Sequence, residues 1–191
     1  MNQEYIEEET IENKDFSNQS IAGRTYEYCT FKNCNFSNTD LSDCHFIETE
    51  FIGCNFSNAN LSQTSFQDVR CSQCKMLGLH FDQCNAFSFS ISFDQCQLNH
   101  SSFYQMKLNR SSFLNSQLEG VDFTETELKN VILKQCNLLN ATLDNTNLEG
   151  ADLTQSTNYA IDPERNKIKG AKFSLPEVVG LLTKYGIQIE K

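Results

Sequence analysis

Apolar residues recur along this chain at every fifth position. Stepping by five from Phe16 to Ala86 gives 15 apolar residues in succession, and the count resumes two residues out of step, from Phe93 to Leu153, through 13 residues that are all Phe or Leu. Apolar residues make up only 39% of the sequence, so this is not a chance pattern. A period of five fits neither a helix nor a long strand. The chain must therefore turn once in every five-residue unit.

The residue two places before each of these apolar positions is small in nearly every unit. Side chains two apart on an extended segment point to the same side, so this second position should also face the interior. It is mostly Cys, Thr, Ser, Ala or Val, as at Cys54, Thr64 and Ser116. Residues 25–156 contain 22 charged residues, and none falls at either inward position, because burying an unpaired charge is costly. The pattern predicts a narrow tube filled by one large and one small side chain per unit.

The register slips by two residues between Ala86 and Phe93. We expect a small bulge or loop near 87–92. At least one of Phe87 and Phe89 should then remain outside the interior. Such an aromatic side chain either contacts a partner or covers the junction between coils.

The five-residue rule ends after Asn158, which divides the chain into a repeat domain, 1–158, and a C-terminal segment, 159–191. A repeat tube needs such a segment to cover its last open coil. The segment Ser-Leu-Pro-Glu at 174–177 fits a helix-capping box, and a glycine at 186 fits a helix stop, so we expect a helix near 175–185. Alternation at 187 and 189 predicts a short strand after it.

This segment holds more apolar side chains than one end of a tube requires. It therefore predicts either a cap alone or a cap that also forms a twofold interface. The candidate dimer-interface residues are Val178, Leu181, Leu182, Ile187 and Ile189.

The repeat resembles that of the pentapeptide-repeat family, whose units have the form A(D/N)Lxx, as in ANLSQ at 59–63 and ADLTQ at 151–155. The resemblance covers most of the chain. It implies an all-β fold, a right-handed quadrilateral parallel β-helix with a C-terminal capping helix and short strand. The four sides per coil come from the resemblance alone, because the period fixes one side and not how many sides close a coil.

Charge and composition narrow the classes of partner. The chain has 25 acidic and 15 basic residues, a formal net charge of -10. This charge opposes binding to nucleic acid or to anionic lipid, and it favours a basic partner or serves only solubility. The acidic opening MNQEYIEEET differs from a secretion signal, and the sequence has no apolar stretch of membrane-spanning length. We expect a cytoplasmic protein without membrane contact.

Nine cysteines raise the question of a metal or redox site. Eight occupy the small inward position and Cys71 the large one, so we interpret them as compact fillers of a reduced core, although Cys71 and Cys74 are close enough in register to pair. His45, His80 and His100 all fall at outward positions. The sequence lacks a recognisable catalytic or phosphate-binding motif. We therefore predict no enzyme activity, no cofactor and no metal.

Within the family, Cys-rich and Phe-rich units followed by a C-terminal cap look like the Qnr group, which protects DNA gyrase from quinolones. This resemblance implies a partial DNA mimic that binds a type II topoisomerase, DNA gyrase or topoisomerase IV, and a homodimer formed through the cap. The long loops of strongly protective Qnr proteins are missing from this sequence, which has only the two-residue slip. The alternative is a structural or protein-interaction scaffold with an unknown partner.

Acidic residues are the candidates for such a binding surface. Glu48 and Asp68 lie 20 residues apart and would stack on one face of a four-sided coil. A second group is clustered in sequence without a basic residue among them. The candidate acidic surface is Glu48, Asp68, Glu119, Asp122, Glu125 and Glu127.

Overall fold

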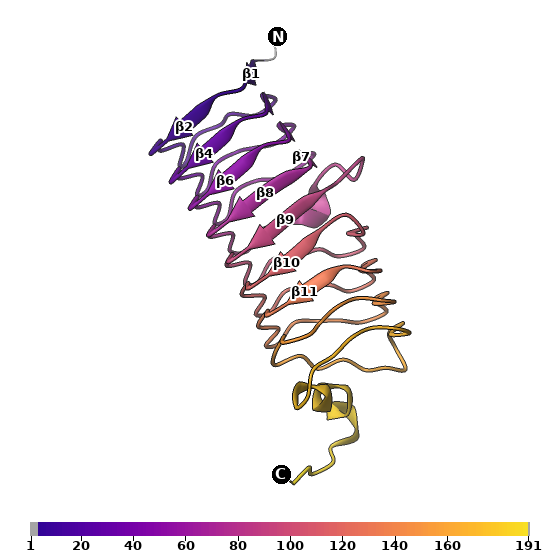
Figure 1. Ribbon diagram of the computed structural model, residues 1–191. Helices are drawn as coiled ribbons and strands as arrows, with labels where there is room; N and C mark the ends of the chain where they lie inside the picture. The colour runs from indigo at the N-terminus through magenta and orange to yellow at the C-terminus, as the bar shows by residue number, and fades with distance from the viewer. Residues whose placement is uncertain (1–3, 191) are drawn as a thin grey trace.

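The protein is an all-β parallel solenoid with almost no helix, described over residues 4–190 of a computed structural model (Figure 1). A four-stranded sheet, in the order β1-β3-β5-β7, contains β1 (Tyr5–Glu7), β3 (Thr25–Glu27), β5 (His45–Ile47) and β7 (Ser65–Gln67). A seven-stranded sheet, in the order β11-β10-β9-β8-β6-β4-β2, contains β2 (Thr10–Glu12), β4 (Thr30–Lys32), β6 (Glu50–Ile52), β8 (Val69–Ser72), β9 (Ile91–Asp94), β10 (Ser112–Leu114) and β11 (Ile132–Lys134). Each pairing joins one coil to the next.

Parallel pairing relates residues that are 20 apart, as Tyr26 is to Phe46, and 22 apart across the slip, as Cys71 is to Phe93. Pairs occur in each of the four successive units of a coil, and we name the four stacks ladders A to D. Ladder A contains β1, β3, β5 and β7 and continues through Lys107, Glu127, Asn147 and Lys167, while ladder B is the seven-stranded sheet. Ladder C begins with the pair Asp15 and Asn35, and ladder D with Ser20 and Asp40.

Stacked aromatic rings fill the interior. Phe36 and Phe56, one coil apart, stack with ring centroids 4.7 Å apart, and Phe31 and Phe51 do so at 5.0 Å. All four side chains are fully buried. Offset stacking of this kind adds to the free energy gained by removing the rings from water. The predicted large inward position is thus confirmed for these repeats.

The small inward position selects hydrogen-bond donors as well as small volume. The Thr64 hydroxyl donates to the Leu41 carbonyl of the preceding coil at 2.8 Å, and the Cys54 thiol approaches the carbonyls of Phe31 and Ile52 at 3.5 and 3.6 Å. All nine cysteines are buried and free, so the predicted role as core fillers is confirmed and the Cys71–Cys74 pair is not formed. Burial raises the pKa of the Cys44 thiol to about 11, which keeps it protonated. Residues 4–190 hold no group of side chains suited to a metal ion.

The slip near 87–92 changes which residue enters the core. Ala86, the predicted inward residue, is exposed, and Phe89 is buried in its place at 4% exposure. The extra residues let the chain reach Phe66 and Phe81 with a large ring, at centroid distances of 6.1 and 6.5 Å, where Ala86 would have left a void. A short 3₁₀-helix, η1 (Phe81–Gln83), precedes the slip.

The C-terminal segment differs from the prediction. Two short 3₁₀-helices, η2 (Glu177–Leu181) and η3 (Thr183–Tyr185), replace the expected single helix over 175–185. The Ser174 hydroxyl accepts a hydrogen bond from the Gln155 backbone N–H at 2.9 Å, so the predicted capping box is not formed. β-Branched residues at 178 and 179 and a glycine at 180 also disfavour an α-helix.

The short strand expected at Ile187 and Ile189 is absent from the described residues, because no neighbouring strand lies beside this segment to pair with it. Parallel bridges continue past Asn158, to Lys167 and Lys172, so coil pairing outlasts the five-residue apolar period. Among the described residues, no helix has the length and apolar character that crossing a membrane requires.

Candidate interaction surface

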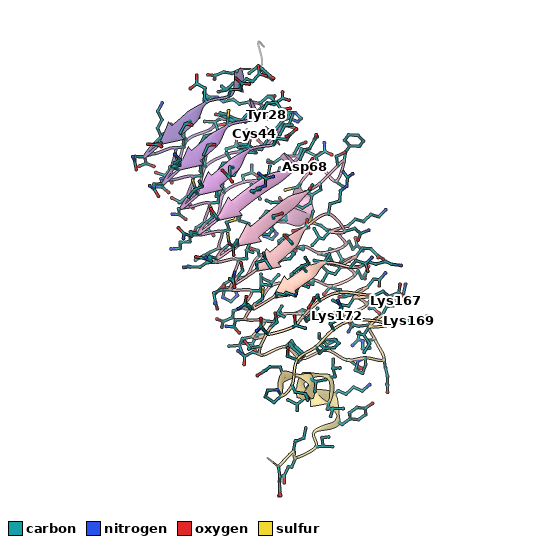
Figure 2. All side chains as sticks on the ribbon, viewed as in Figure 1. Tyr28, Cys44, Asp68, Lys167, Lys169 and Lys172 are labelled. Atoms are coloured by element: carbon teal, nitrogen blue, oxygen red, sulfur yellow. The ribbon has the colours of Figure 1, made fainter. Side chains whose placement is uncertain are left out.

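Ladder A brings Glu48 and Asp68 to the same corner of successive coils. Each follows a strand, β5 or β7, in the left-handed backbone region, with φ of 45° and 53°. Both side chains are exposed, and Tyr28 occupies the same position one coil earlier. Figure 2 shows Tyr28 and Asp68 along the same flank of the rod. The predicted stacking of this pair is therefore present.

A shallow groove runs along this corner, with a volume of about 280 Å³. Glu48, Glu50 and Asp68 supply its carboxylates, Tyr28 and two threonines supply hydroxyls, and Arg70 is the basic residue among those lining it. The Asp68 carboxylate also accepts a hydrogen bond from the Ser90 hydroxyl at 2.8 Å. Asp68 thus holds the slip segment in addition to presenting charge.

The carboxylates of ladder A raise the pKa of two tyrosines. The Glu48 carboxylate raises the pKa of Tyr28, because the phenolate would lie beside another negative charge. The Tyr5 hydroxyl donates to the Glu27 carboxylate, and this hydrogen bond raises the pKa of Tyr5 to about 12. Both phenols remain protonated donors at neutral pH, which suits them to neighbouring carboxylates.

The other four acidic candidates do not join this corner. Glu127 lies in ladder A, and Glu119 lies beside ladder C. Asp122 lies in ladder D, and Glu125 lies two residues after the central apolar residue of the same unit. The Glu125 carboxylate accepts from the Gln105 amide and that of Glu127 from the Asn147 amide, each at 2.8 Å. Glu125 and Glu127 thus link adjacent coils, and the four carboxylates are spread over three ladders, so they form no single acidic stripe with Glu48 and Asp68.

One of the two phenylalanines at the slip lies outside the interior, as predicted. Phe87 is 75% exposed, whereas Phe89 is buried. A groove of about 430 Å³ lies beside the slip, lined by Ala86, Phe89, Tyr104 and Met106 together with four more polar or smaller side chains. Exposed aromatic surface beside an open groove of mixed apolar and polar lining is suited to contact with another protein.

The candidate dimer residues at the C-terminus are exposed to different degrees. Leu182, Ile187 and Ile189 are 39%, 55% and 54% exposed, whereas Val178 and Leu181 are half-buried and Leu181 packs against the core. Lys184 pairs with the carboxylates of Asp162 and Glu164 at 2.7 and 2.6 Å. These pairs lower the pKa of both carboxyl groups and fasten the segment to the last coil.

A group of basic residues was not among the sequence candidates. Lys107, Arg110, Lys167 and Lys169 are exposed and lie in or beside ladder A, downstream of the slip. Their signal in the sequence is that basic residues recur on one ladder, and this recurrence appears when residues 20 apart are aligned. The sequence pattern did not indicate Lys167 and Lys169, because its five-residue apolar period ends after residue 158.

Comparison with known proteins identifies the repeat. The family model described as "Pentapeptide repeat region" matches residues 25–92 and 86–173, whereas no curated protein matches the sequence. A trypsin-treated variant of QnrB1, "a plasmid-mediated fluoroquinolone resistance protein", has a similar structure, with a TM-score of 0.66 at 23% identity over 98% of this chain and 90% of that chain. HetL of the cyanobacterium Nostoc sp. strain PCC 7120 gives a TM-score of 0.60 at 14% identity over 89% of this chain and 87% of its own. Since the family model accounts for well over half of the chain, the protein belongs to the pentapeptide-repeat family.

Proposed function

We propose that this protein is a non-catalytic partial DNA mimic that binds a type II topoisomerase, DNA gyrase or topoisomerase IV, through the acidic N-terminal half of its rod. The four ladders would be the sides of a right-handed quadrilateral coil, whose width suits a DNA-binding channel. The site of action would be the cytoplasm, where the nine thiols remain reduced.

The observation that carries this proposal is the uneven distribution of charge along the rod. Residues 1–90 contain 13 acidic and 5 basic residues, a formal net charge of -8, whereas residues 91–191 contain 12 and 10, a net charge of -2. Five carboxylates lie on ladder A, in or directly after four stacked strands, and they are Glu7, Glu8, Glu27, Glu48 and Asp68. A basic channel would attract this half of the molecule first.

The magnitude of the charge makes the mimicry partial. Three steps of about 4.8 Å separate the four strands, a length of about 14 Å over which duplex DNA carries about eight charges. Ladder A presents five there. The likeness in fold to a fluoroquinolone resistance protein supports the topoisomerase as partner. Strongly protective Qnr proteins carry long projecting loops and this chain has only the small slip loop, so binding and drug protection are separable expectations.

A supercoiling assay with purified gyrase, with and without a quinolone, tests the proposal. We expect the protein at micromolar concentration to change gyrase activity, Glu48→Lys to weaken that change, and Asp43→Lys, at an exposed position of ladder D, to leave it intact. The two variants carry the same change in charge, so they separate ladder A from net charge. An unaltered supercoiling rate at every protein concentration would remove the topoisomerase from consideration.

A scaffold for protein contacts is the second candidate function, favoured by the apolar side chains exposed near the C-terminus. Homodimerisation through this segment is part of both candidates. The Leu182→Asp variant should then be monomeric in light scattering at high salt while the wild-type chain is a dimer. Retention of the dimer by this variant would argue against the C-terminal interface. The exposed apolar residues are Leu175, Val179, Leu182, Tyr185, Ile187 and Ile189.

A further inference from the structure

Ladder A carries opposite charge at its two ends. In and directly after its four strands before the slip, the outward positions hold five carboxylates and, within the described residues, no lysine or arginine, while Arg24, directly before β3, pairs with Glu4. After the slip, basic residues predominate, with Glu127 and Glu149 as the acidic exceptions. Figure 2 shows Tyr28 and Asp68 on the upper part of one flank and Lys167 and Lys169 on the lower part of the same flank. The basic group is Lys107, Arg110, Lys129, Lys167 and Lys169.

Lys107 and the later members of the basic group lie on the same ladder as β1, β3, β5 and β7. Lys107 lies between the ladder D position of Ser102 and the ladder B position of Ser112, as His45 lies between Asp40 and Glu50. Order along the coil therefore fixes its ladder, although the slip interrupts backbone pairing there.

Most of these charges have no salt-bridge partner among the described residues. Lys129 pairs with Glu149 at 3.1 Å, and the Glu127 carboxylate accepts from the Asn147 amide. Among residues 4–190, no salt bridge is formed by the remaining four basic residues of the group, nor by Glu7, Glu8, Glu48 or Asp68. Ladder A thus presents unpaired acids at one end and unpaired bases at the other.

The slip stands at the middle of this ladder. Four units of ladder A precede it, with central residues from Ile6 to Phe66, and four follow, from Leu108 to Ile168. At this midpoint Phe87 is 75% exposed beside the groove of about 430 Å³ lined by Phe89 and Tyr104. An exposed ring and a groove of mixed apolar and polar lining therefore occupy the point about which the charges reverse.

We propose that ladder A is a self-complementary interface through which a second copy of this chain binds in antiparallel orientation. A twofold axis lying across the rod at the slip keeps each column of side chains facing its own copy and reverses the order of the coils. Glu7 then faces Lys169, and Asp68 faces Arg110. Phe87 meets its symmetry mate at the centre. A parallel arrangement would instead oppose like charges.

The size of the face predicts a weak and salt-sensitive pair. Eight coil-to-coil steps of about 4.8 Å and three extended residues of about 3.3 Å give a face of about 38 by 10 Å, or roughly 800 Å² buried in total, below the usual range for stable complexes. Exposed charges are screened beyond about 10 Å at 0.1 M salt. Glu27 would face Glu149, whose charge Lys129 already offsets. Pairing would also cover Glu48 and Asp68, although it does not depend on the proposed topoisomerase binding.

Charge reversal at one end, followed by mixing, tests the interface. Sedimentation velocity at low salt should show self-association of the wild-type chain that weakens at least about tenfold at 0.3 M salt. E7K/E8K and K167E/K169E should each lose this salt-sensitive association, because like charges then face each other. Mixing these two variants should restore the pair, since their ends become complementary. D43K/E119K, with the same charge change as E7K/E8K on ladder D and beside ladder C, should associate like the wild type.

Orientation is tested by cross-linking with a carbodiimide, which joins a carboxylate to a nearby amine. Peptides linking Glu7 or Glu8 of one copy to Lys167 or Lys169 of the other are expected at low salt and should disappear at high salt. A wild-type chain that is monomeric at all salt concentrations would overturn the inference. So would a dimer that both charge-reversed variants retain and Leu182→Asp abolishes, since that result assigns the contact to the C-terminal segment.

Discussion

Single residues in this solenoid are chosen for hydrogen bonding as much as for size. The small inward position faces two backbone carbonyls, one two residues earlier and one in the preceding coil, as Thr126 shows with the carbonyls of Thr124 and Phe103. Both carbonyls already accept a backbone N–H, from Gln105 and Met106, and the hydroxyl supplies a second donor to acceptors that water cannot reach. The preference of this position for Cys, Thr and Ser follows from that geometry, and alanine or valine can satisfy only the volume.

Thr64→Val tests this account at one position. The two side chains have nearly the same shape, so the variant removes the 2.8 Å hydrogen bond to the Leu41 carbonyl, which keeps the Cys44 backbone N–H at 3.1 Å, and should lower the free energy of unfolding by about 0.5–1.5 kcal/mol. Thr64→Ser keeps the hydroxyl and is the matched control. Urea-induced unfolding measures both. A valine variant as stable as the wild type would show that volume alone governs the position.

At the scale of elements, the two-residue slip is a means of placing a large ring in the core. Phe89 contacts the ring layers of Phe66 and Phe81, whereas Phe87 points outward. Phe89→Ala should open a cavity and lower the free energy of unfolding by about 3–5 kcal/mol. Phe87→Ala should change it by less than about 0.5 kcal/mol. Equal effects in urea-induced unfolding would contradict this assignment of the two rings.

Periodicity predicted the elements well where one side chain per unit decides its own burial. Every inward residue expected between Cys29 and Leu79 is buried. The choice of Phe89 over Ala86 was not predictable, because it depends on the cavity that Phe66 and Phe81 leave. At the C-terminus, the Ser174 hydroxyl binds Gln155, a contact made between distant residues, so local helix signals gave the wrong element. The stacking of Glu48 on Asp68 followed from the 20-residue coil, whereas Lys167 and Lys169 of the basic group lie in coils beyond residue 158, where the apolar period has ended.

Over the whole molecule, carboxylates with lowered pKa values link stability to pH. Asp40 and Asp152 lie on different ladders and in distant coils, and each has a pKa below its ordinary value. At Asp152, partial burial opposes the shift, but hydrogen bonds from Thr154 and the charge of Lys134 at 3.1 Å outweigh it. Such a group contributes stability at neutral pH, and that contribution falls once the unfolded chain begins to take up protons.

Asp152→Asn should therefore reduce the dependence of stability on acid. In the wild type, the contribution of this carboxylate is complete above the unfolded pKa of about 3.9 and is lost as pH falls through the lower folded value. Urea-induced unfolding measured from pH 7 to pH 2 should show the variant less stable than the wild type at neutral pH and the difference shrinking in acid. Asp43→Asn, at an exposed carboxylate without a salt bridge among the described residues, is the matched control and should follow the wild-type curve. If the difference between Asp152→Asn and wild type stayed constant across this range, the charge of Asp152 would have no part in holding the coils of ladder B together.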